Sequence, residues 1–240
     1  MEERLKELTA GDNGRKVLRW VDLRIGKDES IALIGSNGCG KSTLFRVVTG
    51  LLLPGGGEVK FLGESMVGQS PDSRVRMGIG YLKQTKKVFP GLTVVENLQL
   101  AGESVVAAGW VEARISELMV VFPVLAAARE KWAGLLSGGQ RQSLAVAMVL
   151  MRRPRLLLLD EPVAGMAPEA GRDLLEAVEA LRRKEGFPLV IVEHRLRQVQ
   201  PHVNRVLVMR EGRIVDDTRE TERMLDADWL VQHYVNGGKA

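Results

Sequence analysis

Cysteine is almost absent from this sequence, because Cys39 is the single one in 240 residues. One thiol cannot form an internal disulfide, and this favours a reducing compartment. Long apolar runs are also missing, since no stretch approaches the roughly 18 residues of a membrane-spanning helix. Residues 1–6 are mostly charged and lack the apolar segment of a secretory signal. We therefore expect no disulfide, no membrane span and no export signal.

A strong charge of either sign is missing too. Lys and Arg number 34 and Asp and Glu number 30, so the net charge is +4 at pH 7. We interpret short basic clusters, such as residues 152–153 and 182–184, as solvated faces, and nucleic acid is not an expected partner. The hydrophobic share of 45% is ample for a core. The length predicts one large α/β domain, or one domain with a small subdomain.

The sequence does contain a phosphate-binding loop. Residues 35–43 fit the pattern G-x-x-x-x-G-K-[ST] at every fixed position, between an apolar strand pattern at 30–34 and a helical stretch that ends at Gly50. Glycines let the backbone approach a phosphate closely, and N–H groups at the start of a helix attract anions. The residues expected to bind nucleotide here are Gly35, Ser36, Asn37, Gly38, Cys39, Gly40, Lys41, Ser42 and Thr43.

Three side chains of this loop have distinct expected roles. Lys41 can reach the β and γ phosphates, and the Ser42 hydroxyl can ligate Mg²⁺. Cys39 is either a small residue that fits or a thiol activated by the surrounding N–H groups. The alternative to a nucleotide site, an ordinary glycine-rich turn before a helix, does not account for the strand, the Lys-Ser pair and the helix together.

Acidic side chains end a second apolar strand. Residues 155–159 lead into Asp160 and Glu161, a pattern typical of a strand buried on both faces of a parallel sheet. Ligands of such sheets lie at the carboxyl ends of the strands. Asp160 is therefore expected to hold Mg²⁺, through water, and Glu161 to orient or deprotonate an attacking water. The alternative is a solvated strand end.

Two further sites are suggested by position. His194 follows the strand pattern at 188–192, in the same register as Asp160 and Glu161, which favours a functional role over a structural one. Ser137 and Gln140 match a capping box at the start of a helix. Gly138 and Gly139 leave N–H groups unobstructed there, so the segment is either a second anion site or an ordinary capped helix.

The rest of the chain alternates strand and helix patterns. From residue 94 to about 133 the apolar spacing is helical and predicts an inserted subdomain. The other expected elements are strands at 17–25, 58–63 (at a sheet edge), 76–82 and 206–215 (a hairpin), an amphipathic helix at 171–185 and a closing helix from 218 to about 235.

Taken in order, these segments resemble the motifs of the ATP-binding subunits of ABC (ATP-binding cassette) transporters. The similar segments are residues 35–43 for Walker A, Gln84 after Tyr81-Leu82-Lys83 for the Q-loop, Leu136-Ser137-Gly138-Gly139-Gln140 for the signature, 156–160 for Walker B, Glu161 for the catalytic glutamate and His194 for the switch histidine. The resemblance covers nearly the whole chain.

The resemblance implies a P-loop NTPase core with a parallel sheet, an N-terminal antiparallel β subdomain and a helical subdomain at about 94–150, all within one cassette at 1–240. It implies an ATPase that uses ATP and Mg²⁺, with Gln84 contacting the metal. It also implies a head-to-tail dimer in which Ser137, Gly138 and Gly139 meet the γ-phosphate held by the other subunit. Permease subunits and a solute-binding protein would be further partners, and the location would be the cytoplasmic face of the membrane.

Residues 88–98, 161–168 and 192–194 are most similar to the ATPases of importers for branched-chain amino acids and urea. Two alternatives stay open: the ATPase of an exporter of the lipopolysaccharide type, and a soluble ABC protein acting on ribosomes or DNA.

The chain departs from the family pattern at Asp12, where an aromatic residue usually stacks on adenine. It departs again at Ala167, where many members have aspartate. The branched-chain branch often lacks that aspartate too, so we interpret Ala167 as a mark of lineage.

Overall fold

The computed structural model describes residues 3–12, 15–83, 88–103 and 108–234. Its strands are β1 (Glu3–Asp12), β2 (Arg15–Ile25), β3 (Ser30–Ile34), β4 (Gly56–Phe61), β5 (Glu64–Ser65), β6 (Ile79–Leu82), β7 (Leu156–Asp160), β8 (Leu189–Val192), β9 (Arg205–Arg210) and β10 (Arg213–Thr218). Its helices are α1 (Lys41–Val48), α2 (Pro71–Met77), α3 (Val94–Glu103), α4 (Ala108–Val121), α5 (Pro123–Ala126), α6 (Gly138–Leu150), α7 (Pro168–Glu185), α8 (Leu196–Val199) and α9 (Ala227–Tyr234), with 3-10 turns at Ala133–Leu135, Gln200–His202 and Thr221–Leu225.

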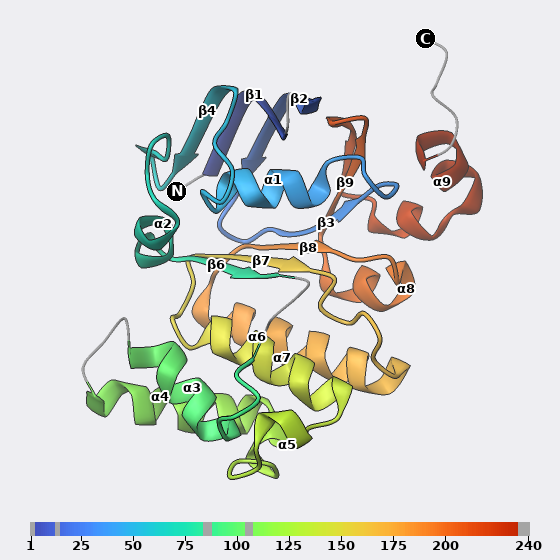
Figure 1. Cartoon of the computed structure of the whole chain (residues 1–240). Helices are drawn as coiled ribbons and strands as arrows, with labels where there is room; N and C mark the ends of the chain where they lie inside the picture. Colours follow the sequence, from blue (N-terminus) through green and yellow to red (C-terminus); the bar gives the residue numbers. More distant parts are fainter. Residues whose placement is uncertain (1–2, 13–14, 84–87, 104–107, 235–240) are drawn as a thin grey trace.

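Two sheets organise the molecule (Figure 1). In the described residues, the larger sheet has the strand order β10-β9-β3-β8-β7-β6, and its strands are parallel except for β10. The smaller sheet is antiparallel, with the order β2-β1-β4-β5. Strands β3 and β7 are buried along their whole length, as expected of apolar strands covered on both faces. The expected α/β class, with an N-terminal antiparallel sheet, is confirmed.

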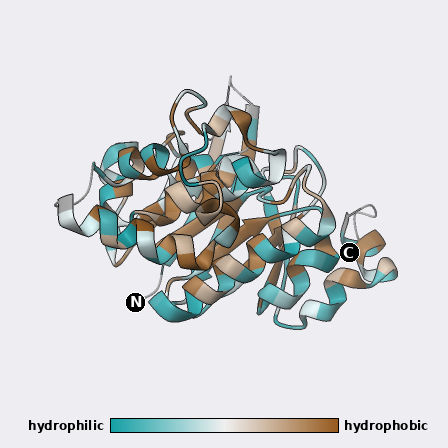
Figure 2. Cartoon of the chain, turned by 90° about the horizontal axis from the view of Figure 1, so that it is seen from below, coloured by the Kyte–Doolittle hydropathy of each residue, from teal (hydrophilic) through white to brown (hydrophobic). Residues whose placement is uncertain are grey.

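The hydrophobic core lies on both faces of the larger sheet. On one face, α1 lies between the two sheets, and Phe45 and Leu44 from this helix are buried with Phe61 from β4. On the other face, α6 and α7 cover the sheet, and the helices from α3 to α5 lie beneath them (Figure 1). Viewed from that side, hydrophobic and hydrophilic residues alternate along each helix (Figure 2). This is the pattern of helices that bury one face and leave the other in water.

The helices between β6 and β7 are anchored to α7 by a buried ion pair. The guanidinium of Arg114, on α4, bonds to the Glu185 carboxylate at the end of α7 and donates to the Leu150 carbonyl at 2.7 Å. The side chain of Arg114 has no exposed surface, and it also pairs with Glu117 at 3.0 Å. Buried charges of this kind are stable only when they are paired and hydrogen-bonded.

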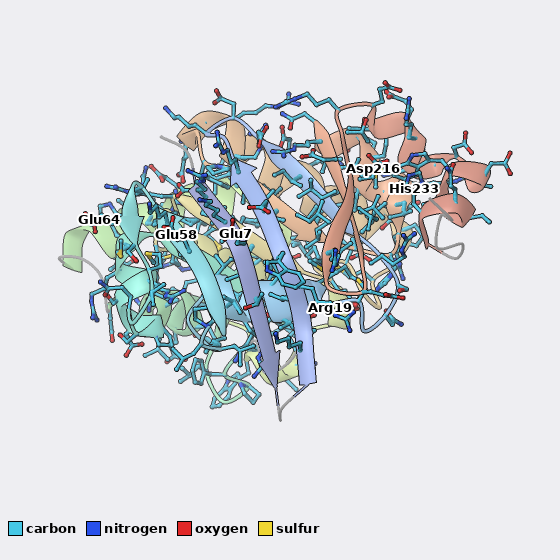
Figure 3. All side chains as sticks on the ribbon, turned by 90° about the horizontal axis from the view of Figure 1, so that it is seen from above. Glu7, Arg19, Glu58, Glu64, Asp216 and His233 are labelled. Atoms are coloured by element: carbon cyan, nitrogen blue, oxygen red, sulfur yellow. The ribbon has the colours of Figure 1, made fainter. Side chains whose placement is uncertain are left out.

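The outer face of the antiparallel sheet is polar. Seen from above, charged side chains that include Glu7 and Glu58 cover it (Figure 3). Helix α9 is held against β10 by His233, whose Nε2 lies 3.2 Å from the Asp216 carboxylate (Figure 3). The His233 ring also lies against Trp229, with 4.6 Å between the ring centroids.

Three expected elements were wrong in part. The strand expected at 76–82 begins only at Ile79, because Ser70 caps α2 and Gly78 ends that helix in the left-handed conformation. The strand expected at an edge, β4, pairs on both sides, with β1 and with the two-residue β5. The closing helix expected from 218 is a 3-10 turn followed by α9, because β10 extends to Thr218.

Candidate functional site

The predicted site residues come together because of strand order. Strands β3, β8 and β7 are neighbours and parallel, so their carboxyl ends lie at one edge of the sheet. The phosphate-binding loop follows β3, His194 follows β8, and Asp160 and Glu161 end and follow β7. This edge is the usual ligand position in an open α/β sheet.

The phosphate-binding loop has a backbone that only glycine adopts easily. Gly35, Gly38 and Gly40 have φ values of 152°, 78° and 118°. A Cβ added to Gly35 would lie 2.1 Å from the Met209 carbonyl oxygen, whereas one on Gly38 would meet open space. The loop is braced from outside by the turn between β9 and β10, where the Gly212 N–H donates to the Cys39 carbonyl at 2.8 Å.

The start of α1 fits a phosphate group. Gly40 is the N-cap and contributes no side-chain hydrogen bond, so the first N–H groups of the helix are left for a ligand. The Lys41 ammonium is held over the loop, where it donates to the Gly35 and Ser36 carbonyls at 2.6 and 3.0 Å. Loop, helix start and lysine therefore fit the phosphates of a nucleotide. Cys39 is 5% exposed and packs in the core, with its Sγ 3.8 Å from the Lys41 ammonium.

Asp160 is a buried carboxylate beside this loop. It is 5% exposed, and the Tyr81 hydroxyl donates to it at 3.4 Å. Burial raises the pKa of Asp160 and the Glu161 charge adds to the increase, while hydrogen bonds from the Ser42 and Tyr81 hydroxyls and the Lys41 charge oppose it. An oxygen donor set of Ser42 and Asp160 is of the kind that Mg²⁺ prefers, so these residues fit a magnesium ion.

Replacing Asp160 by asparagine is expected to stabilise the nucleotide-free protein and to impair activity. Because folding raises the pKa of Asp160, the ionised group destabilises the fold above that pKa, and this penalty fades as the pH falls through it. At pH 7, Asp160→Asn should raise Tm by about 2–4 °C for each kcal/mol of penalty removed. Turnover of ATP should fall by about 10- to 100-fold, because a ligand that acts on the metal through water is lost.

Thermal unfolding and phosphate release measure both effects. Because burial raises the pKa of Asp160, the gain in Tm should shrink as the pH of the scans is lowered through that pKa. A variant with lower Tm at pH 7 would contradict the prediction.

Glu161 and His194 face one another. The His194 Nε2 lies 3.3 Å from the Glu161 carboxylate, and both side chains are partly exposed. Glu161 has a φ of 52°, in the left-handed region that non-glycine residues rarely adopt. Such strained residues gather at functional sites, where the surrounding structure holds them in place.

The signature segment lies at the start of α6. The predicted capping box is confirmed: the Ser137 hydroxyl accepts from the Gln140 N–H at 3.2 Å, and the Gln140 side chain accepts from the Ser137 N–H at 3.0 Å. Ser137 and Gly138 are exposed. A Cβ on Gly139 would lie 3.5 Å from the Met166 side chain. The segment thus begins helix α6 at the surface, near the loop that follows Glu161.

The structure does not test the predictions for two residues, Gln84 and Asp12. Gln84 lies outside the described residues. Strand β1 ends at Asp12, but the position of this side chain is outside the described part of the chain as well.

The sequence still makes a prediction for Asp12. Without the usual aromatic residue, one base stack worth about 1–3 kcal/mol is missing. We expect weak ATP binding with poor discrimination between ATP and GTP, measured by titration of both nucleotides. Micromolar binding of ATP alone would contradict this expectation.

Three residues of the site were missed by sequence reasoning. Tyr81 donates its hydroxyl to Asp160, and burial raises its pKa, with the Asp160 charge adding to the increase. Glu193, next to His194, is 4% exposed and accepts three backbone N–H groups. Arg195 donates to the Met166 carbonyl at 2.6 Å. The sequence signal that could have identified Glu193 is its position at the end of the predicted strand, next to His194.

Comparison with known proteins agrees with this geometry. The family model described as ABC transporter matches residues 18–164, more than half of the chain. The chain is 36% identical over 200 residues to the high-affinity branched-chain amino acid transport ATP-binding protein BraG of Pseudomonas aeruginosa, covering 83% of this chain and 85% of that protein. It is 35% identical over 211 residues to the probable branched-chain amino acid transport ATP-binding protein LivF of Archaeoglobus fulgidus, covering 88% and 89%. An aliphatic sulfonates import ATP-binding protein, SsuB of Pseudomonas entomophila, is 33% identical over 200 residues, covering 83% and 70%.

Solved structures show the same fold. A crystal structure of MJ1267, an ATP-binding cassette of an ABC transporter, is 29% identical with a TM-score of 0.88, over 98% of this chain and 100% of that chain. The ADP conformation of MJ1267 is also 29% identical, with a TM-score of 0.85 over 96% and 97%. Within the described residues, no helix is both long and apolar enough to span a bilayer. This chain belongs to the ABC transporter family, and it is an ATP-binding cassette with the ABC ATPase fold that binds and hydrolyses ATP.

Proposed function

We propose that this protein is the ATPase subunit of an importer, which dimerises on ATP and drives a membrane permease. The structural observation that supports the ATPase part of the proposal is the contact between Glu161 and His194, 3.3 Å apart beside the phosphate-binding loop. In this proposal, a carboxylate that orients water lies next to a side chain that contacts the γ-phosphate. Import is proposed from the names of the relatives.

In this proposal, each residue of the site has a separate role in phosphoryl transfer. Such a reaction needs positioning and charge neutralisation more than covalent chemistry. The N–H groups of the loop and Lys41 bind the phosphates, and Glu161 orients the attacking water. His194 contacts the γ-phosphate and holds the Glu161 side chain. A magnesium ion bound with ATP supplies further positive charge, and Ser42, Asp160 and Gln84 are its proposed ligands.

A second subunit completes the site in this proposal. Ser137 and Gly138 are exposed at the start of α6. Exposed N–H groups at a helix start suit an anion. The signature of one subunit therefore contacts the γ-phosphate bound by the loop of the other, in a head-to-tail dimer.

A groove beside β6 is the proposed contact with the permease. It lies between β6, α3 and α6, and its walls include Tyr81, Leu82, Leu100 and Met148. Phe89 and Leu100 are 52% and 41% exposed. An apolar groove rimmed by exposed side chains suits the apolar face of a partner helix. The helices at 94–150 form the subdomain that presents this groove, and the protein works at the cytoplasmic face of the membrane.

The solute is proposed from the relatives. BraG and LivF are named for branched-chain amino acids, and SsuB for aliphatic sulfonates. Both solute classes combine a short aliphatic chain with an anionic group, a carboxylate or a sulfonate, and the amino acids also carry an ammonium group. We assign import of a small solute of this chemistry, with branched-chain amino acids as the first candidate. An associated solute-binding protein would select it.

The test is purification of the tagged protein from its native membranes in mild detergent, with partners identified by mass spectrometry. Two multi-spanning permeases and a solute-binding protein are expected, and titration of that binding protein with leucine and with an alkanesulfonate would separate the two solutes. A partner set typical of an exporter, or ribosomal partners in the soluble fraction, would refute the importer.

A further inference from the structure

The loops that carry Glu161 and His194 are joined by a buried carboxylate. The backbone ladder between β7 and β8 ends where the Glu161 N–H donates to the Val192 carbonyl at 2.8 Å, the last such bond in the described residues. Beyond this point the Glu193 side chain joins the two loops: one carboxylate oxygen accepts from the Val163 N–H at 3.2 Å.

The other oxygen of the same carboxylate fixes the histidine loop. It accepts from the His194 N–H at 2.8 Å and from the Arg195 N–H at 3.3 Å. Glu193 is 4% exposed, so three N–H groups replace the water that an ionised carboxylate would otherwise bind. One buried group therefore sets the backbone on both sides of the contact between Glu161 and His194.

A second tie runs between the same two loops. The Arg195 guanidinium donates to the Met166 carbonyl at 2.6 Å. Val163 and Met166 are themselves linked, because the Met166 N–H donates to the Val163 carbonyl at 3.2 Å. The segment after Glu161 is thus held at both ends by the loop after β8.

We propose that Glu193 is a positioning residue for ATP hydrolysis, which holds Glu161 and His194 in register by joining their loops. This inference rests on the proposed roles of Glu161 and His194. Glu161 needs such support because its backbone is strained, with a φ of 52°. Glu193 touches no phosphate in this proposal and acts only through the two loops. Its effect therefore belongs to turnover rather than to nucleotide affinity.

Glu193→Gln tests the proposal. The glutamine oxygen can still accept from the His194 and Arg195 N–H groups, but its amide then directs a donor at the Val163 N–H. The substitution removes the bond between the loops and preserves the local turn. We expect kcat to fall on the order of 10- to 100-fold, with KM and the affinity for ATP unchanged.

Glu3→Gln is the matched control. Glu3 is 7% exposed, accepts the Leu62 N–H at 2.8 Å and lies in β1, remote from the site. The Glu3→Gln control therefore measures how the loss of a buried carboxylate changes Tm when the site itself is untouched. A kcat at the wild-type value in Glu193→Gln, with only a change in Tm as in Glu3→Gln, would overturn the proposal.

A double-mutant cycle with His194→Ala measures the coupling between the two substitutions in kcat. A purely structural role of Glu193 would not produce such coupling. If Glu193 acts through this contact, Glu193→Gln should have little further effect on kcat in the His194→Ala background. Independent, multiplying effects would contradict the proposal. If Glu193→Gln does not fold, Glu193→Asp keeps the charge but shortens the side chain, so that one carboxylate no longer reaches both loops. Unchanged kcat in that variant would overturn the proposal as well.

The reference variants separate this inference from the proposed function. Wild-type turnover in both Glu161→Gln and His194→Ala would refute the proposed site itself. Loss of turnover in those two variants, with full turnover in Glu193→Gln, would refute the positioning role alone.

Discussion

Replacing Glu161 by glutamine is expected to abolish ATP turnover while leaving ATP binding intact. The carboxylate is 3.3 Å from His194 and follows β7 directly, beside the phosphate-binding loop. A general base contributes about 10²- to 10⁴-fold to such reactions, and glutamine keeps the shape of the side chain but is not basic. Phosphate release at saturating ATP should fall by this factor.

The same variant should accumulate the ATP-bound dimer. Glutamine removes one negative charge near the γ-phosphate and blocks the step that would separate the subunits. Light scattering with ATP and Mg²⁺ should show a mass twice that of the monomer, whereas the wild type should return to monomer as ATP is consumed. Glu222→Gln, at an exposed position in the 3-10 turn before α9, is the control and should keep wild-type turnover. Undiminished phosphate release from Glu161→Gln would remove Glu161 from the mechanism.

Replacing Arg74 by methionine is expected to lower the free energy of unfolding more than any other substitution proposed for this protein. Arg74 is 1% exposed, and its guanidinium donates to the Val47 and Val48 carbonyls at 2.6 and 2.8 Å. It also donates to the carbonyls of Gln69, at 3.2 Å, and Met66. Arg74 thus caps the carboxyl end of α1, the helix that follows the phosphate-binding loop, and its charge opposes the negative end of the helix dipole.

Methionine fills similar space but donates no hydrogen bond. Each buried carbonyl left without a partner costs about 1–3 kcal/mol, so we expect a total loss of about 3–5 kcal/mol after relaxation. For a chain of this size, Tm falls by about 2–4 °C per kcal/mol. Denaturant and thermal unfolding measure the loss.

Arg76→Met is the matched control for this variant. Arg76 lies two residues further along α2 and is exposed. Its replacement should change stability by no more than about 0.5 kcal/mol, as is usual at the surface. Equal stability losses in the two variants would show that the carbonyls around Arg74 do not depend on it.

Local patterns were sufficient for the elements next to the site. Four consecutive leucines before Asp160 predict β7 as a strand buried on both faces, because only a parallel sheet covered on both sides hides such a run. Ser137 and Gln140 predict the start of α6, because a capping box depends on side chains three residues apart. Where local signals were mixed, boundaries were wrong. Residues 76–82 read as one strand, although Gly78 separates α2 from β6.

The buried charged residues could not be predicted. Glu193 and Arg74 are residue types that are mostly exposed, and their partners are distant in sequence: Val163 lies thirty residues before Glu193, and Val47 twenty-seven before Arg74. No local periodicity in the sequence indicates contacts between residues so far apart. The same holds for Tyr81, whose hydroxyl reaches Asp160 because β6 and β7 are neighbours in the sheet.

The sequence by itself determined the segments proposed to carry the chemistry of this protein: the phosphate-binding loop, Asp160 at the end of β7 with Glu161 after it, the histidine after β8 and the capped signature helix. These are short segments whose residue types follow from local backbone and ligand geometry. Tertiary structure alone decided how Glu161 and His194 meet, how Glu193 joins their loops and how Arg74 closes α1. Each of these depends on strand order and burial, which bring together side chains that no stretch of sequence places side by side.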